Sequence, residues 1–288
     1  MKKSNIFKVI LMALLPFFIC SCSLIKDDLD EATIYTTVYP INFLVNYMYG
    51  DYAKSIESIY PSDCDLNTYE IPEKKLKEYA NAELFIYNGL TNEKNIAKSL
   101  VNTNKNLIII DASYRLNLEN NTTELWLSPN NFLMLAKNIK DKLTENLKNK
   151  STIDGVNSKF NNFEERISTM DASLHAIGKE ASLKGKNTII ASNSSLKFLN
   201  NYGFNVIALD DEDYFTPAKL LMLKNSFLSG RYKNLLVADT DKSNELVNEL
   251  SSKYKASIID VNTMTLSLEN DYFDIMATFI ENVKNAAC

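Results

Sequence analysis

Short apolar segments recur along this chain in two sets of four, and each is followed by a segment with helical character. The first set comprises residues 33–39, 55–59, 83–87 and 107–110. The second comprises residues 188–191, 205–209, 235–238 and 257–261. Strands this short and apolar, alternating with helices, are typical of parallel sheets that are covered on both faces. The pattern predicts an α/β protein with two lobes, each a parallel sheet flanked by helices.

A different pattern separates the two sets of segments. Apolar residues recur at steps of four and three from Val156 to Ala181, which predicts one helix of about seven or eight turns. Gly185 stands where this helix is expected to end. A helix of this length would join the lobes as a rigid link, with a ligand cleft between them. Because ligands bind beyond the carboxyl ends of parallel strands, both sets of strand ends are expected to face that cleft.

The N-terminus has the pattern of a secretory signal: three lysines among the first eight residues, a short apolar run, and the sequence Ile19-Cys20-Ser21-Cys22. A polar, acidic segment follows at once, so we expect Cys22 to be lipidated and to hold the protein on the outer side of the bacterial cell membrane. An ordinary signal peptide is the alternative. The expected organisation is a signal peptide (1–21), a tether (22–31), an N-terminal lobe (32–150), a linking helix (151–185) and a C-terminal lobe (186–288).

Charge and residue usage exclude several functions. The net charge of −5 falls to −8 when residues 1–21 are removed, which argues against a nucleic-acid partner. The seven glycines form no nucleophile elbow and no phosphate-binding loop, and the single histidine, His175, is expected away from the cleft, so serine- or cysteine-type catalysis lacks its usual base. We therefore expect a protein that is not an enzyme. We also expect it to be a monomer. His175 is expected to be a partly exposed helix residue rather than a metal ligand, because a metal site needs several converging ligands.

Six segments resemble motifs of one known family, the metal-type solute-binding lipoproteins of ABC transporters, which include ZnuA-like zinc-uptake and manganese-uptake proteins. They are Thr-Thr-Val-Tyr-Pro (36–40), Asp-Leu-Asn-Thr-Tyr-Glu (65–70), Ala-Glu-Leu-Phe-Ile-Tyr-Asn-Gly (82–89), Glu-Leu-Trp-Leu-Ser-Pro (124–129), Ser-Asn-Ser-Ser-Leu-Lys-Phe-Leu (192–199) and Asp-Tyr-Phe-Asp-Ile-Met (271–276). The segments occur in the family's order over residues 32–286, with the long helix in the expected place. Their shared order, rather than any one motif, carries the resemblance.

The resemblance also implies where a metal ion would bind. The family usually uses two histidines, then a histidine or glutamate, then an acidic residue. In this chain the four positions fall on Asn67, Glu124, Asn193 and Asn262, with Asp239 and Asp260 as acidic alternatives to the last. Tight zinc sites prefer imidazole or thiolate, whereas this oxygen-rich set suits a harder ion such as manganese, magnesium or calcium. Cys64 could add a thiolate, although packing of its loop explains that residue more simply.

The resemblance implies a capture protein that would bind a divalent metal ion of the zinc or manganese class and deliver it to a membrane permease and its ATPase. Two alternatives remain open. The same scaffold could bind another small ligand, because the amides of Asn67 and Asn193 supply both donors and an acceptor. It could also be a surface adhesin that kept the fold and lost the metal site.

Overall fold

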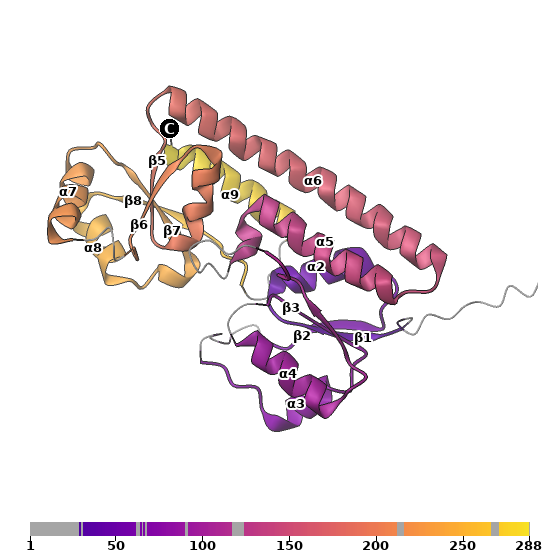
Figure 1. Cartoon of the computed structure of the whole chain (residues 1–288). Coiled ribbons are helices and arrows are strands. Elements are labelled where there is room, and N and C mark those ends of the chain that lie inside the picture. The colour runs from indigo at the N-terminus through magenta and orange to yellow at the C-terminus, as the bar shows by residue number, and fades with distance from the viewer. Residues whose placement is uncertain are drawn as a thin grey trace, which may run out of the picture.

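The computed structural model of the chain describes residues 29, 31–61, 64, 66, 68–89, 92–116, 124–211, 216–265 and 271–287 (Figure 1). Two four-stranded parallel sheets lie in separate lobes, and a long helix runs along both. The predicted fold class is therefore confirmed. Within the described residues, none of the helices combines the length and the apolar character needed to cross a membrane.

The N-terminal sheet has the strand order β2-β1-β3-β4. Its strands are β1 (Thr33–Thr36), β2 (Ser55–Ser58), β3 (Leu84–Tyr87) and β4 (Ile108–Asp111), and its helices are α2 (Tyr39–Tyr49), α3 (Glu73–Tyr79), α4 (Glu93–Thr103) and α5 (Pro129–Asn146). Alternate residues of β3 enter different cores: Leu84 and Ile86 join one buried cluster, and Phe85 and Tyr87 the other. Both faces of the sheet are thus covered at β3, which explains why this strand reads as a continuous apolar run.

The C-terminal sheet repeats this topology in the order β6-β5-β7-β8. Its strands are β5 (Thr188–Ala191), β6 (Asn205–Ala208), β7 (Asn234–Ala238) and β8 (Ser257–Val261). They are connected by the 3₁₀ helix η3 (Ser194–Tyr202), α7 (Pro217–Leu228), the 3₁₀ turn η4 (Asp239–Asp241) and α8 (Glu245–Tyr254), and α9 (Tyr272–Ala287) follows the last strand. In each lobe the first strand lies between the second and the third. The chain therefore crosses from β1 toward one edge of its sheet and from β3 toward the other edge, and β5 and β7 behave in the same way. This makes each pair a topological switch point, where open α/β sheets bind ligands.

The long helix is α6 (Lys150–Leu183), which begins at the side-chain cap of Asn149 on the backbone N–H of Ser151. Its 34 residues span about 50 Å. Gly185 follows with a φ of +65°, the left-handed conformation that commonly ends helices. The predicted apolar stripe is on the buried face of this helix, from Val156 through Phe163 to Ala181.

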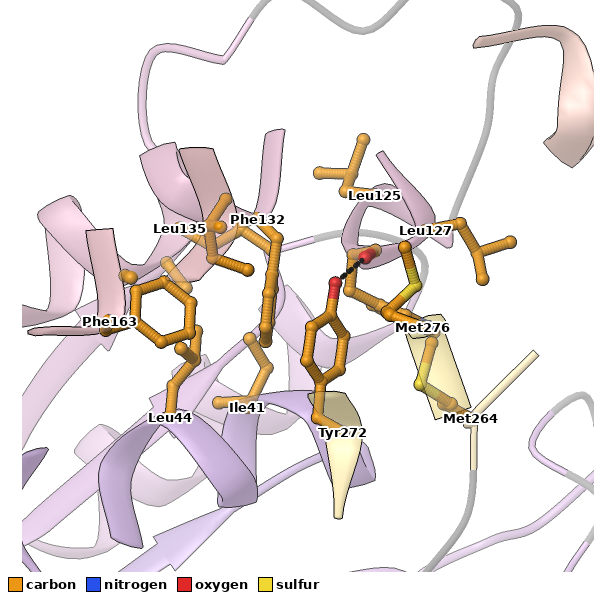
Figure 2. Close-up of a cluster of buried hydrophobic side chains, with 14 of the residues drawn as sticks. Ile41, Leu44, Leu125, Leu127, Phe132, Leu135, Phe163, Met264, Tyr272 and Met276 are labelled. Carbon is orange, nitrogen blue, oxygen red and sulfur yellow. Dashed lines mark hydrogen bonds between the residues drawn. The ribbon is translucent and has the colours of Figure 1, made fainter. Parts of the chain in front are cut away.

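One apolar core joins the lobes. A single buried cluster contains Ile34 of β1, Ile189 of β5 and Phe163 of α6. Figure 2 shows part of it, where Tyr272 at the start of α9 packs against Phe132 of α5, with ring centroids 4.1 Å apart. Each fully buried side chain of this size contributes about 1.5–3 kcal/mol, so separating the lobes would cost several such contacts.

Hydrogen bonds strengthen this junction around the 3₁₀ turn η2 (Leu125–Leu127). The indole N–H of Trp126 donates to the carbonyl oxygen of Thr263, which follows β8, at 2.6 Å. The hydroxyl of Tyr272 donates to the carbonyl oxygen of Trp126 at 2.7 Å (Figure 2). The segments after β4 and β8 are therefore bonded directly to each other, which limits how far the lobes can open.

Candidate functional site

The switch point of the N-terminal lobe is occupied by a buried carboxylate. Glu93, the first residue of α4, is 3% exposed. It hydrogen-bonds the Thr37 hydroxyl after β1, and its Oε2 accepts from the backbone N–H of Gly89, after β3, at 3.2 Å. The Thr37 hydroxyl in turn accepts from the backbone N–H of Asn88 at 3.2 Å. This arrangement, the Thr37–Glu93 clasp, ties the ends of β1 and β3 to the start of α4.

Burial controls the charge of Glu93. Removal from water raises the pKa of its carboxyl to about 7, because the hydrogen bonds from Thr37, Asn88 and Gly89 only partly offset the lost hydration. The nearby carboxylate of Asp111 raises this pKa further. The clasp is therefore closed by a group that exchanges its proton near neutral pH.

Asp111 and Ser113 lie beside this clasp and are hydrogen-bonded to each other; we call this pair the Asp111–Ser113 floor of the switch point. Oδ1 of Asp111 accepts hydrogen bonds from the backbone N–H and the hydroxyl of Ser113, each at 3.0 Å. Gly89 has a φ of +85°, and a Cβ there would lie 2.0 Å from Oδ1 of Asp111. The N-terminal switch point is thus filled by its own side chains.

The switch point of the C-terminal lobe has the same design. The hydroxyl of Ser192, after β5, accepts from the backbone N–H of Ala238, at the end of β7, at 2.9 Å. The same hydroxyl donates to Oδ2 of Asp241 at 2.6 Å. This Ser192–Asp241 clasp reproduces the first, with a hydroxyl that receives a backbone N–H and donates to a carboxylate. Asp241, however, is half-buried rather than sealed.

Asn193, a predicted metal ligand, belongs to this second clasp. Its Nδ2 donates to Oδ2 of Asp241 at 2.7 Å. Its Oδ1 accepts from the backbone N–H of Ser195 at 3.0 Å and also from the Ser195 hydroxyl, so Asn193 is the N-cap of η3. Both ends of the amide are engaged within the protein, and the two acceptor positions of its oxygen are filled.

The other predicted ligands of this lobe gather at its β8 edge. Asp239, Asp260 and Asn262 line one cavity of about 400 Å³ between β8 and α9, together with Lys242 and Asp274. Within this group, Asp260 pairs with Lys242 at 3.2 Å and Oδ1 of Asn262 accepts from the backbone N–H of Met264 at 2.8 Å. Neither Asn193 nor Glu124 lines this cavity, so the structure divides the predicted set into separate groups.

Asp239 bonds toward β8 rather than toward the switch point. Its Oδ1 accepts from the hydroxyl of Thr263 at 2.6 Å and from the backbone N–H of the same residue at 3.2 Å. Thr263 follows β8, so this carboxylate closes the β7–β8 side of the sheet. Asp239 and Asp241, two residues apart, therefore bond to opposite neighbours of β7.

Glu124 lies immediately before η2, which packs against η3 of the other lobe. Its side chain is half-buried, and no hydrogen bond or ion pair of its carboxylate is found among the residues that the structure describes. Buried carboxylates are normally paired, which makes Glu124 unusual among the described residues.

Of the four remaining residues singled out in the sequence, the structure describes Cys64 and His175. Asn67 and Cys22 lie outside the described residues. Cys64 is half-buried beside Tyr60. The imidazole of His175 is 57% exposed, lies 3.7 Å from the Asp171 carboxylate and packs on the ring of Tyr202. That position agrees with the prediction of a partly exposed helix residue.

The side-chain donors at the described ligand positions suit a hard cation better than zinc. Over the described part of the chain, no three His, Cys, Asp or Glu side chains converge to hold a metal ion. The predicted ligand positions that the structure describes carry only carboxylate or amide side chains. Carboxylate and amide oxygens are typical ligands of calcium, magnesium and manganese.

Sequence reasoning missed Asp241 and Glu93. Asp241 follows β7 in Asp239-Thr240-Asp241, a stretch that looks like a solvated turn, and only the adjacency of β5 and β7 brings it to Asn193. Glu93 looks like an ordinary acidic residue in the first turn of a helix. The useful signal was the position of Thr37 and Ser192, hydroxyl residues directly after the first strand of each lobe.

Two parallel α/β lobes whose strand ends meet at a shared junction define a two-lobed solute-binding protein. Residues 34–286 match the model of the family described as zinc-uptake complex component A, periplasmic, and the chain belongs to this family. The resemblance found in the sequence is thereby confirmed.

Solved structures with the same fold include Zn(II)-bound AdcA from Streptococcus pneumoniae, at 18% sequence identity and a TM-score of 0.72 over 89% of this chain. The match spans 58% of the AdcA chain. The metal-dependent lipoprotein YcdH from Bacillus subtilis matches at 19% identity and a TM-score of 0.72, covering 88% of this chain and 98% of YcdH. A periplasmic metal-binding protein from Candidatus Liberibacter asiaticus matches at 16% identity and a TM-score of 0.72, covering 88% and 99%. No curated protein matches the chain in sequence.

Proposed function

We propose that this protein captures a divalent metal ion between its lobes and delivers it to a membrane permease and its ATPase. The observation that carries the proposal is Glu124, a half-buried carboxylate without a described partner. It occupies the position of a ligand in the family motif and lies beside the junction between the lobes. Asn67 from the same lobe, and the strand-end residues Asn193, Asp239, Asp260 and Asn262 from the other, are the remaining ligand candidates.

The proposed metal is an oxygen-preferring ion such as manganese rather than zinc. The family is described by zinc uptake and AdcA was solved with Zn(II), so zinc is the alternative suggested by relatives. Zinc sites rely on imidazole or thiolate, and the one imidazole here is exposed on α6. The shared core and the Trp126–Thr263 hydrogen bond support a capture mechanism with only small movements of the lobes.

The direct test is elemental analysis of the purified mature protein, followed by thermal unfolding with zinc, manganese, calcium and magnesium. An ion that binds only the folded state raises the unfolding midpoint as its concentration exceeds the dissociation constant. We expect a saturable shift that Glu124→Gln removes and His175→Ala leaves intact. Equal effects of the two substitutions, or no shift with any ion, would contradict the proposed site.

We further propose that Cys22 anchors the protein, as a monomer, on the outer side of the cell membrane. A single soluble protein tethered this way would stay close to its permease. Cys22→Ser should release the protein from the membrane fraction, whereas the matched variant Cys20→Ser should not. Retention of the Cys22→Ser protein in membranes would contradict the anchor.

A second candidate function is capture of a small organic cation or zwitterion. The cavity at the β8 edge favours it, because the carboxylates of Asp239, Asp260 and Asp274 and the ammonium of Lys242 line a volume of about 400 Å³, a size typical of small-molecule sites. Thermal unfolding with amino acids and polyamines distinguishes this candidate. Stabilisation by these compounds, lost in Asp274→Asn and retained in Glu124→Gln, would support it over metal capture.

A further inference from the structure

At its β5/β7 switch point the C-terminal lobe offers a donor that the family motif does not identify. The motif places a ligand at Asn193, but its oxygen already caps η3 and its nitrogen is bonded to Asp241. A metal ion could use the Asn193 oxygen only by displacing the Ser195 donors from the helix terminus. Asp241, the residue that Asn193 contacts, is therefore the stronger candidate for a metal ligand.

Hydrogen bonds hold one oxygen of the Asp241 carboxylate, and the other oxygen is the candidate metal donor. Its Oδ2 accepts two hydrogen bonds, from Ser192 at 2.6 Å and from Asn193 at 2.7 Å. For its Oδ1, no hydrogen bond or ion pair is found in the part of the chain that the structure describes. Hydrogen bonds to one oxygen of a carboxylate fix its orientation, which is how outer residues position metal ligands.

Position in the sheet separates Asp241 from the other acids of this lobe. It is bonded to Ser192 after β5, and so it lies at the β5/β7 switch point. Asp239 is bonded to the far side, toward β8, and Asp260 pairs with Lys242. Since open α/β sheets bind ligands at their switch points, Asp241 is the acid placed where a ligand is expected.

We propose that Asp241 is the carboxylate with which the C-terminal lobe binds the captured cation, and that Asn193 is a positioning residue that holds it. This inference rests on the proposed function. In the proposed complex, Asp241 of the C-terminal lobe and Glu124 of the N-terminal lobe would each supply one negative charge and carboxylate oxygen donors. That combination selects a divalent, oxygen-preferring ion, since carboxylate count and charge set affinity for such ions.

The test compares Mn²⁺, Ca²⁺ and Zn²⁺ binding by isothermal titration calorimetry in the wild type and in Asp241→Asn. Asparagine keeps an oxygen that can accept from Ser192 and Asn193 but removes the charge. We expect affinity to fall by more than the about 10- to 100-fold typical of losing an outer-shell partner. The unfolding midpoint of the metal-free variant should stay close to that of the wild type.

Asp210→Asn is the matched control. Asp210 also accepts two hydrogen bonds from a serine after β5, at 3.0 Å from the backbone N–H of Ser194 and 2.7 Å from its hydroxyl, but it follows β6, away from the β5/β7 switch point. Its substitution should leave metal affinity unchanged.

Asn193→Ser tests the positioning role. Serine is a good N-cap, so η3 stays capped, but the donor to Asp241 is lost. We expect a loss of affinity of about 10- to 100-fold, smaller than that of Asp241→Asn. This variant also keeps the proposal testable should Asp241→Asn fold poorly.

The outcomes separate this inference from the proposed function. Metal binding by the wild type with equal affinities in Asp241→Asn and Asp210→Asn would overturn the role of Asp241 and leave metal capture standing. A wild type that binds none of the three ions would overturn metal capture, and the role of Asp241 with it. Unchanged affinity in Asn193→Ser, beside a large loss in Asp241→Asn, would reject only the positioning role.

Discussion

The two lobes close their switch points with the same device but expose it differently. In both, a hydroxyl after the first strand accepts from a backbone N–H at or just after the end of the third strand and bonds a carboxylate, Glu93 in one lobe and Asp241 in the other. Glu93 is sealed, and burial raises its pKa to about 7, whereas Asp241 is half-buried and has one oxygen without a described partner. The same clasp therefore stabilises the N-terminal lobe and, in our proposal, supplies a ligand in the C-terminal lobe.

The largest expected effect of this difference is a pH dependence of the free energy of unfolding that originates in the N-terminal lobe. The pKa of Glu93 rises from 4.5 to about 7 on folding, so the folded state favours the protonated form. Its contribution is fully present below pH 4.5 and is lost as pH rises through about 7. The shift corresponds to about 3 kcal/mol in the free energy of unfolding.

Urea denaturation at pH 5 to 8 checks this prediction in the wild type and in Glu93→Gln, which cannot ionise. The variant should show a much flatter pH dependence. Glu249→Gln is the control in the other lobe: a hydrogen bond from Lys224 lowers the pKa of Glu249, so this group titrates below the range and the wild-type slope should persist. A Glu93→Gln variant with the wild-type slope would show that Glu93 is not the titrating group.

A second effect compares glycines that have positive φ in each lobe. Gly89 (φ +85°) lies against Asp111 and Ser113, and a Cβ would come within 2.1 Å of the Ser113 hydroxyl. Gly230, after α7, has a φ of +75°, with no described atom within 4 Å of an added Cβ. Both alanine variants carry the backbone strain of about 1 kcal/mol or more, but only Gly89→Ala adds a clash.

We therefore expect Gly89→Ala to lower the free energy of unfolding by about 2 kcal/mol more than Gly230→Ala does. Chemical denaturation of the two variants at one pH measures the difference. Similar losses would mean that the Asp111–Ser113 floor can move aside, and that the N-terminal switch point is less tightly filled than its contacts indicate.

The fold could be predicted from the sequence, but the two clasps could not. Strands and the stripe on α6 follow from apolar periodicity, which is a property of neighbouring residues in the chain, and those predictions are confirmed. The partnership of Asn193 with Asp241 joins residues 48 positions apart and depends on β5 lying beside β7. The family motif identified the position of Asn193 but not that its amide caps a helix, because capping depends on the local backbone path.

The smallest effect in this comparison concerns the two hydroxyls themselves. Thr37→Val keeps the shape of the side chain but leaves the backbone N–H of Asn88 and the sealed Glu93 carboxyl each without one bond, a loss of about 2 kcal/mol. Ser192→Ala also removes a bond to a backbone N–H, but water can hydrate the half-buried Asp241, so we expect about 1 kcal/mol. Denaturation measures both losses.

Metal binding should reverse that order. Loss of the Ser192 hydroxyl frees Asp241 to rotate, so Ser192→Ala should weaken metal affinity by about 10-fold or more, the scale of an outer-shell bond. Thr37→Val should leave affinity unchanged, because Glu93 is enclosed within its own lobe. If Thr37→Val also weakened binding, the N-terminal clasp would contribute to ligand binding, and the functional division between the lobes would be wrong.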